Sequence, residues 1–238
     1  MKTNPTSPSW DQVVAALEAW RKALREEPAR GQGAAGPGSE EPAVSTVAEQ
    51  YKRDPWAILV STIISLRTKD AVTLTVSQAL LQKAPNPVLL EALPVEEVAR
   101  LVYPAGFYRT KAASLKKIAG ILIEQYQQQV PATMEELLAL PGVGRKTANL
   151  VLTEAFDLDG ICVDIHVHRI SNRLGWVTSS TPEQTETALR AVLPQQYWKG
   201  INALLVLYGQ RLCRPVSPFC SRCVIRPYCK RRGVERSR

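Results

Sequence analysis

The segment Leu140–Asn149, LPGVGRKTAN, constrains the fold of this chain more than any other stretch. Pro141 ends one helical pattern, because proline cannot continue a helix, and an apolar helical pattern resumes after Arg145. Gly142 and Gly144 permit a tight turn and leave backbone amides accessible to an anion. A plain turn between helices usually needs one glycine, so the two glycines favour a helical hairpin that binds phosphate.

Helical patterns cover most of the remaining chain, and no segment shows the sustained period-two alternation typical of strands. A first helix is expected after a cap at Ser9, with an apolar face formed by Val13, Leu17, Trp20 and Leu24. Further helices are expected at 56–66, 71–83, 95–102, 111–128, 133–140, 146–156, 165–174, 183–193 and 198–212. We therefore predict an all-α fold.

Local signals mark where some of these segments begin. The stretch Pro28–Pro42 is rich in Gly, Pro and Ala and is expected to be a flexible linker. Asp54 and Pro55 form a cap and a first-turn proline for the next helix, and Thr181 begins a capping box. The longest apolar run, Ala57–Leu66, is far shorter than the roughly 20 residues that span a bilayer. With no signal-peptide pattern at the first residues, an intracellular protein is expected.

The positive charge of the chain is concentrated in one region. The formal net charge is +8, and Gln210–Arg238 alone holds nine basic residues and one acidic residue. The rest of the sequence is therefore neutral overall. Such a concentration suits a polyanion such as nucleic acid, because each neutralised phosphate releases counterions. The alternative is a solubilising tail.

Lys146 and Asp164 are the candidate catalytic residues. Lys146 falls in the first turn of a predicted helix, where the helix dipole and the adjacent Arg145 disfavour its cation. A neutral amine can attack carbon and form a Schiff base. The alternative for Lys146 is a simple phosphate contact. Asp164 could be only the N-cap of the next helix, although a capping carboxylate can also stabilise a developing positive charge.

Four of the five cysteines lie close together in the sequence. Cys213, Cys220, Cys223 and Cys229 are separated by six, two and five residues. Structural zinc sites usually combine two short cysteine pairs, so this spacing fits zinc poorly. Four thiolates in a compact loop can bind a [4Fe–4S] cluster. The isolated Cys162 is expected to be a small buried hydrophobe.

The segments LPGVGRKTANLVL and VDIHVHRISNRLGW together resemble the helix-hairpin-helix DNA glycosylases of the endonuclease III branch. The resemblance extends from about Trp10 to Tyr228. It implies that Lys146 and Asp164 are catalytic, and that the four clustered cysteines hold a [4Fe–4S] cluster. It also implies that the hairpin residues Gly142, Val143, Gly144 and Arg145 contact DNA.

The resemblance implies two helical domains with a DNA cleft between them. A six-helix domain containing the hairpin is expected at residues 48–158. Residues 1–47 and 159–238 are expected to form the second domain, with the N-terminal helix, the linker and the cluster loop. The linker would then be a crossing between domains.

The resemblance also implies two loops that fill the gap left when a damaged base is turned out of the duplex. One is Ser65–Asp70, in which Arg67 stands where the family usually has glutamine. Arginine is longer and charged, and it can contact an orphaned base or a phosphate. The other is Pro104–Tyr108, in which Phe107 either wedges into the base stack or packs in the core. Lys111 is expected to contribute only charge.

Two further residues are candidate DNA contacts. His166, next to the proposed site, either contacts DNA or holds its loop. Arg214 is the only basic residue between the first two cysteines, where many relatives have several. The DNA-binding charge is therefore expected to come also from Arg222, Arg226 and the arginine-rich end.

The resemblance implies a bifunctional DNA glycosylase and AP lyase of base excision repair that removes oxidised pyrimidines. Lys146 would expel the base and form an imine, and β-elimination would cut the strand. A monomer acting on damaged double-stranded DNA is expected, with no membrane association. In a bacterium it would be cytoplasmic and nucleoid-associated, with nuclear or mitochondrial locations as alternatives. The rival functions are a monofunctional mismatch glycosylase and a non-catalytic DNA-binding iron–sulfur protein.

Overall fold

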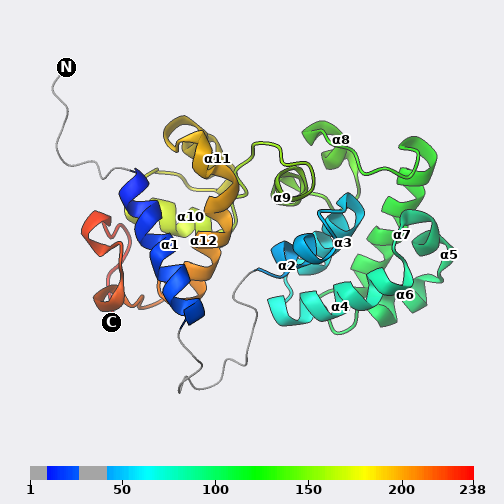
Figure 1. The fold of residues 1–238 in the computed structure, drawn as a ribbon, viewed down its shortest axis with the longest axis horizontal. Helices are drawn as coiled ribbons and strands as arrows, with labels where there is room; N and C mark the ends of the chain where they lie inside the picture. Colours follow the sequence, from blue (N-terminus) through cyan, green and yellow to red (C-terminus); the bar gives the residue numbers. More distant parts are fainter. Residues whose placement is uncertain (1–9, 27–41) are drawn as a thin grey trace. The chain divides into compact units, whose positions relative to one another are not determined.

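The computed structural model describes residues 10–26 and 42–238, and all regular elements in those residues are helices (Figure 1). The predicted all-α fold is therefore confirmed. The expected cap at Ser9 and all of the expected linker except Pro42 lie outside the described residues. The chain divides into two compact units, one of residues 1–36 and 161–238 and the other of residues 37–160.

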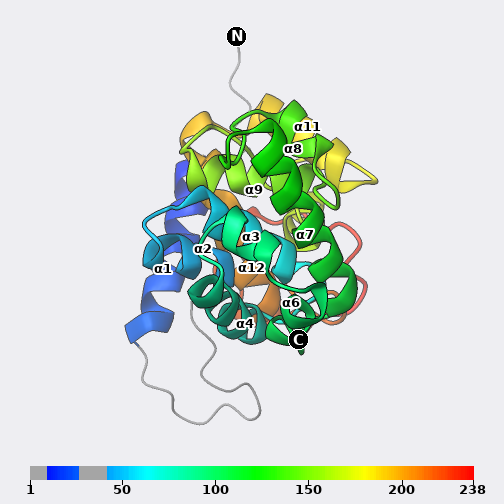
Figure 2. The same ribbon diagram turned by 90° about the vertical axis from the view of Figure 1, so that its right-hand side faces the viewer.

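The unit of residues 37–160 is organised around one buried helix, α3 (Pro55–Ser65). Nine of its eleven residues are buried, and it packs against its neighbours α2, α4, α7 and α9 (Figure 2). The Asp54 carboxylate accepts a hydrogen bond of 2.8 Å from the Ala57 amide, so the predicted cap is present. The helices around it are α2 (Ala43–Gln50), α4 (Asp70–Lys83), α5 (Pro87–Ala92), α6 (Val95–Leu101), α7 (Tyr108–Gln125), α8 (Met134–Ala139) and α9 (Arg145–Ala155).

The other unit is formed by helices from both ends of the sequence. It contains α1 (Trp10–Glu26), α10 (Ile165–Leu174), α11 (Pro182–Val192) and α12 (Trp198–Arg211), followed by two short 3₁₀ turns at Cys220–Arg222 and Arg226–Tyr228. The predicted apolar face of α1 packs inward, since Val13 and Leu17 are fully buried. The Trp20 ring meets the Tyr208 ring of α12 edge-on, with 4.8 Å between centroids. These contacts join α1 to the rest of this unit.

The predicted helices are present, with ends that differ by a few residues. The largest shift concerns the helix expected at 111–128, which begins at Tyr108 and ends at Gln125. Gln127 and Gln128 have φ angles of 51° and 67°, a left-handed conformation that a helix cannot continue through. The helices α2 and α5, of eight and six residues, were not predicted.

The described residues contain no helix that is both long enough and apolar enough to cross a membrane.

Candidate functional site

The hairpin between α8 and α9 needs a glycine at only one of its two glycine positions. Gly142 has a φ of +81°, in the left-handed region that favours glycine. Gly144 has an extended backbone with a φ of −99°, and a Cβ atom there would meet open space. Neither backbone conformation nor internal packing therefore requires a glycine at Gly144. Two reasons for a glycine remain: it is a favoured N-cap residue, and it lets an external group approach the backbone closely.

The start of α9 has the features of an anion-binding helix terminus. Gly144 is its N-cap, and no side chain caps the helix. Arg145 and Lys146 are its first two residues, and both are exposed. Val143 is buried and its amide donates to the Leu140 carbonyl over 3.1 Å, which fixes the turn. Backbone amides and two basic side chains thus lie at the positive end of the helix dipole.

Asp164 is the N-cap of α10, which is one of the two roles expected for it. Its Oδ1 accepts hydrogen bonds from the amides of His166 and Val167, at 2.8 and 2.9 Å. These two hydrogen bonds fix the position of the carboxylate at the start of α10. Asp164 belongs to the unit of residues 1–36 and 161–238, whereas the hairpin and Lys146 belong to the other unit.

The helix α10 also carries polar side chains that hold the loop following α12. The Arg169 guanidinium donates to the Cys213 carbonyl over 2.9 Å, and its Nη2 lies 3.1 Å from Nδ1 of His166. Burial lowers the pKa of Arg169. The His166 ring packs closely on Gly209 of α12, where a Cβ atom would come within 2.4 Å of Nδ1. His166 therefore contributes to the packing of α10 on α12.

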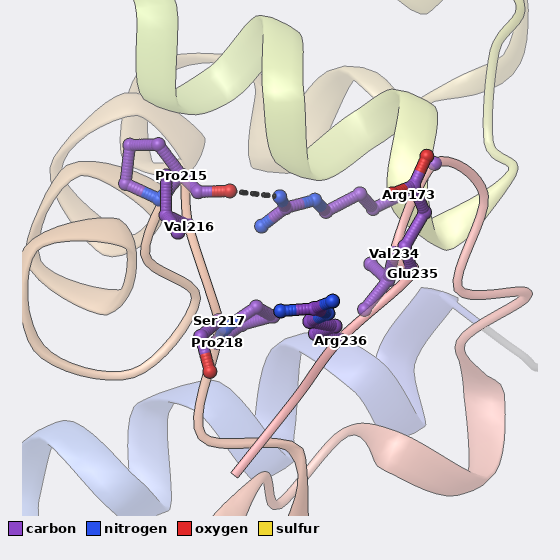
Figure 3. Close-up of a pocket in the computed structure, with 9 residues that line it drawn as sticks. Arg173, Pro215, Val216, Ser217, Pro218, Val234, Glu235 and Arg236 are labelled. Carbon is purple, nitrogen blue, oxygen red and sulfur yellow. Dashed lines mark hydrogen bonds between the residues drawn. The ribbon is translucent and has the colours of Figure 1, made fainter.

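Arg173, one helical turn further along α10, is buried and binds the next part of the same loop. Its Nη1 donates to the Arg214 carbonyl at 2.7 Å, and its Nη2 donates to the Pro215 carbonyl at 2.6 Å. Figure 3 shows this side chain extending towards Pro215, with Val234–Arg236 lining the same pocket. Neither Arg169 nor Arg173 was predicted from the sequence as a functional residue. Their spacing of four residues on one helix was the available signal.

The four clustered cysteines are half-buried, and none forms a disulfide. Burial raises the pKa of the Cys223 and Cys229 thiols, and neighbouring cysteines raise it further. Hydrogen bonds reach three of the sulfur atoms: from Tyr208 Oη to Cys223 at 3.0 Å, from Arg173 to Cys213 at 3.5 Å and from the Arg231 amide to Cys229 at 3.4 Å. At Cys223 and Cys229 these donors partly oppose the effect of burial on the pKa. In the described part of the chain, no three His, Cys, Asp or Glu side chains are grouped to hold a metal ion.

This donor set can still be compared with a cubane cluster. In a [4Fe–4S] cluster each thiolate binds a different iron, so the ligand sulfurs stand farther apart than those around a single ion. The donor set of four cysteine sulfurs, three of them with hydrogen-bond donors, is the kind that such a cluster requires. Cys162, by contrast, is buried away from this group, as predicted, and its carbonyl accepts from Asn202 over 2.9 Å.

The basic segment Lys230–Arg238 is docked on this unit. The Arg238 amide donates to the Pro218 carbonyl over 2.8 Å, and the Ser221 amide donates to the Arg238 carbonyl over 2.9 Å. The Arg238 guanidinium also lies over the Phe219 ring, 4.8 Å from its centroid. The backbone of Lys230–Arg238 is therefore held beside the cysteine loop, so this basic segment is not a detached tail.

The two loops expected to fill the DNA stack touch each other. Phe107 is 62% exposed, so the alternative that it packs in the core is wrong. The Arg67 guanidinium carbon lies 5.4 Å from the centroid of the Phe107 ring. The expectation that Lys111 contributes only charge is also wrong. It is buried, and its Nζ donates to the carbonyls of Ile64 and Leu66 and to the Thr68 hydroxyl.

The sequence matches a known family over its central part. Residues 60–195 match the HhH-GPD superfamily of base excision DNA repair proteins. This match covers more than half of the chain and includes the hairpin, Lys146 and Asp164. The chain belongs to this superfamily.

Individual relatives narrow this assignment to the endonuclease III group. Endonuclease III of Thermotoga maritima is 45% identical over 183 residues, which cover 76% of this chain and 86% of the relative. Endonuclease III homolog 2 of Arabidopsis thaliana, described as chloroplastic, is 44% identical over 72% of this chain but only 47% of its own length. The predicted family is thereby confirmed: the chain belongs to the endonuclease III group of DNA glycosylases.

Solved structures agree with this family assignment. A trapped endonuclease III–DNA covalent intermediate, described as an estranged-adenine complex, superposes with a TM-score of 0.73 and 29% identity, covering 93% of this chain and 95% of that one. A thermostable thymine-DNA glycosylase has a TM-score of 0.68 at 21% identity, over 92% and 98% of the two chains, and it shows the shared fold.

Proposed function

We propose that this endonuclease III-like enzyme is bifunctional, removing oxidised pyrimidines from double-stranded DNA and then cutting the strand at the same site. The observation that carries the proposal is the start of α9. There a glycine with no internal structural requirement precedes an exposed lysine in the first turn of an uncapped helix. Backbone amides in that position suit a DNA phosphate, and the adjacent amine suits the sugar next to it.

Lys146 is the proposed nucleophile. Its neutral Nζ attacks C1′, the glycosidic bond breaks, and the base leaves with the bonding electron pair and takes up a proton. Opening of the sugar ring gives an imine between C1′ and Nζ. Removal of a proton from C2′ then expels the 3′ phosphate by β-elimination, which cuts the strand.

Asp164 is proposed to stabilise the positive charge that develops at the sugar. Its two amide hydrogen bonds hold the carboxylate in place at the start of α10. The cap and the catalytic role therefore use the same charged group.

We further propose that DNA is contacted by Gly142, Val143, Gly144, Arg145, Arg67, Phe107, His166 and Arg214. Cys213, Cys220, Cys223 and Cys229 are proposed to hold a [4Fe–4S] cluster. When bound, the cluster would cross-link the loop after α12 and hold it against its unit. Arg169 and Arg173 fix the backbone of that loop from α10, which supports a structural role for this region.

Borohydride trapping on duplexes containing thymine glycol tests the proposed nucleophile. The unchanged protein should form a covalent DNA adduct, and Lys146→Gln should form none. Lys117→Gln, an exposed lysine of α7 in the same unit, is the matched control and should be trapped normally. Normal trapping of Lys146→Gln would eliminate it as the nucleophile. Base release without any strand cleavage by the unchanged protein would indicate a monofunctional enzyme.

A panel of duplexes varied in lesion and opposite base tests the substrate. Oxidised pyrimidines should be released faster than mismatched thymine or adenine. If binding occurs without base release from any duplex, the proposed glycosylase activity is wrong and a DNA-binding scaffold remains.

A further inference from the structure

Arg67 and Phe107 share an uncommon backbone conformation. Their φ angles are 53° and 56°, in the left-handed region that side chains other than glycine seldom adopt. Both side chains are exposed, and they stack on each other as a cation–π pair. Two strained residues from separate loops persist together only if their surroundings hold them.

Lys111 holds the first of these loops from beneath. Its Nζ donates to the Ile64 carbonyl at 2.7 Å, the Leu66 carbonyl at 2.6 Å and the Thr68 hydroxyl at 2.7 Å. The three N–H bonds of an ammonium thus meet three acceptors, on either side of Arg67. The side chain is only 6% exposed, and burial lowers its pKa to about 8. Lysine is rarely buried so completely, which points to a specific role for this ammonium.

The second loop is joined to the first through the same hydroxyl. The Gly106 amide donates to Thr68 Oγ1 over 3.1 Å, so Thr68 links Lys111 to the residue that precedes Phe107. A Cβ atom at Gly106 would lie 2.3 Å from the Arg67 carbonyl oxygen. The two backbones are therefore in direct contact, and only glycine fits between them.

We propose that Lys111 is a positioning residue that joins these loops, so that Arg67 and Phe107 meet DNA as one preassembled wedge. This inference rests on the proposed function. A wedge ordered before binding loses less conformational entropy when it enters the base stack. The flat, charged guanidinium held on the ring is then presented to the base opposite the lesion, and this fixed orientation sets the preference for that base.

Fluorine NMR tests the preassembled wedge without DNA. The chain has three phenylalanines, so 4-fluorophenylalanine gives three signals, and Phe107→Leu identifies one of them. The Arg67→Ala variant gives the reference position of the Phe107 signal when no guanidinium is stacked on the ring. In Lys111→Met that signal should move to the same position, while the Phe156 and Phe219 signals stay in place and report an intact fold. Lys117→Met on the same helix is the control.

Thr68→Val is a milder substitution that tests the same inference if Lys111→Met disturbs the fold. Thr68→Val removes only the shared hydroxyl and keeps both carbonyl contacts of Lys111, so the Phe107 signal should move part of the way. If the Phe107 signal remains at its original position in both variants, the inference is wrong.

Single-turnover base release opposite each of the four bases tests the consequence for the reaction. Arg67→Ala should change the ratio of rates between opposite bases by about two- to five-fold, the size that an exposed cation–π pair contributes. In a Lys111→Met background, Arg67→Ala should change this ratio of rates by less than about two-fold. An undiminished Arg67→Ala effect in that background would overturn the inference. If the unchanged protein releases no base at all, the proposed function is wrong. The NMR result still decides whether Lys111 joins the loops of Arg67 and Phe107.

Discussion

Replacing Asp164 by asparagine and by alanine separates its structural role from its proposed catalytic role. The carboxylate accepts hydrogen bonds from the His166 and Val167 amides, and it carries its charge at the positive end of α10. Asparagine keeps an oxygen for these amides and is about as good an N-cap as aspartate. Asp164→Asn therefore loses only the interaction between charge and helix dipole, about 0.3–1 kcal/mol. Asp164→Ala also loses the cap, at a cost of about 0.5–2 kcal/mol.

The two variants should differ in melting temperature but not in the rate of base release. At about 2–4 °C per kcal/mol for a protein of this size, Asp164→Ala should melt several degrees below the unchanged protein, and Asp164→Asn much less. Both lack the carboxylate charge, so both should release base about 10²–10³-fold more slowly in single turnover, the range for loss of one preorganised electrostatic group.

Thermal denaturation, single-turnover base release and binding to an intact duplex measure the three quantities separately. Wild-type base release by Asp164→Asn would refute the catalytic role. Loss of DNA binding in that variant, with no effect on the chemical step, would refute it as well. Melting of Asp164→Ala at the wild-type temperature would refute the capping argument.

Three further predictions follow from other contacts. Gly142→Ala should destabilise the protein by about 1–2 kcal/mol in urea denaturation because of its left-handed backbone. Gly144→Ala should cost less stability, because the backbone there is extended and a Cβ atom meets open space, but it should weaken DNA binding. The reverse pattern would contradict our interpretation of the hairpin. Cys229→Ser should abolish the visible absorbance of an iron–sulfur cluster and lower the melting temperature, and an unchanged spectrum would argue against this ligand. Burial lowers the pKa of Lys111 to about 8 from 10.5, so its ammonium destabilises the folded state below pH 8, and this cost disappears as the pH rises towards 10.5. The free energy of unfolding of the wild type relative to Lys111→Met should therefore increase by up to about 3 kcal/mol across that window, and a flat difference would show that the lysine is not desolvated.

The sequence was sufficient to predict features that depend on nearby residues. The caps at Asp54 and Thr181 act on amides three residues away, and both are present in the structure. In the capping box the side chain of Gln184 returns to the Ser180 amide instead of the Thr181 amide, a detail of rotamer and loop shape. The position of Lys146 in a first helical turn likewise followed from the local pattern.

Features that depend on distant residues were not predictable in this way. The acceptors of Lys111 lie more than forty positions earlier in the sequence, so no local pattern distinguishes it from a surface lysine. The contacts of Arg173 with residues 214 and 215 have the same origin. Phe107 was ambiguous because exposure of an aromatic side chain depends on the packing of the surrounding elements.

The two ends of α10 are constrained by different neighbours, and this limits how the helix can vary. Ten residues at about 1.5 Å each make a rigid element some 15 Å long. A rotation of α10 that improved the fit of Arg173 to its two carbonyls would turn the capped amides at the other end by the same angle. Compensating changes must therefore arise on the loop and not on the helix. Tolerance to substitution should be concentrated at outward positions such as Ile165, which is 67% exposed and can change without altering the orientation of the helix.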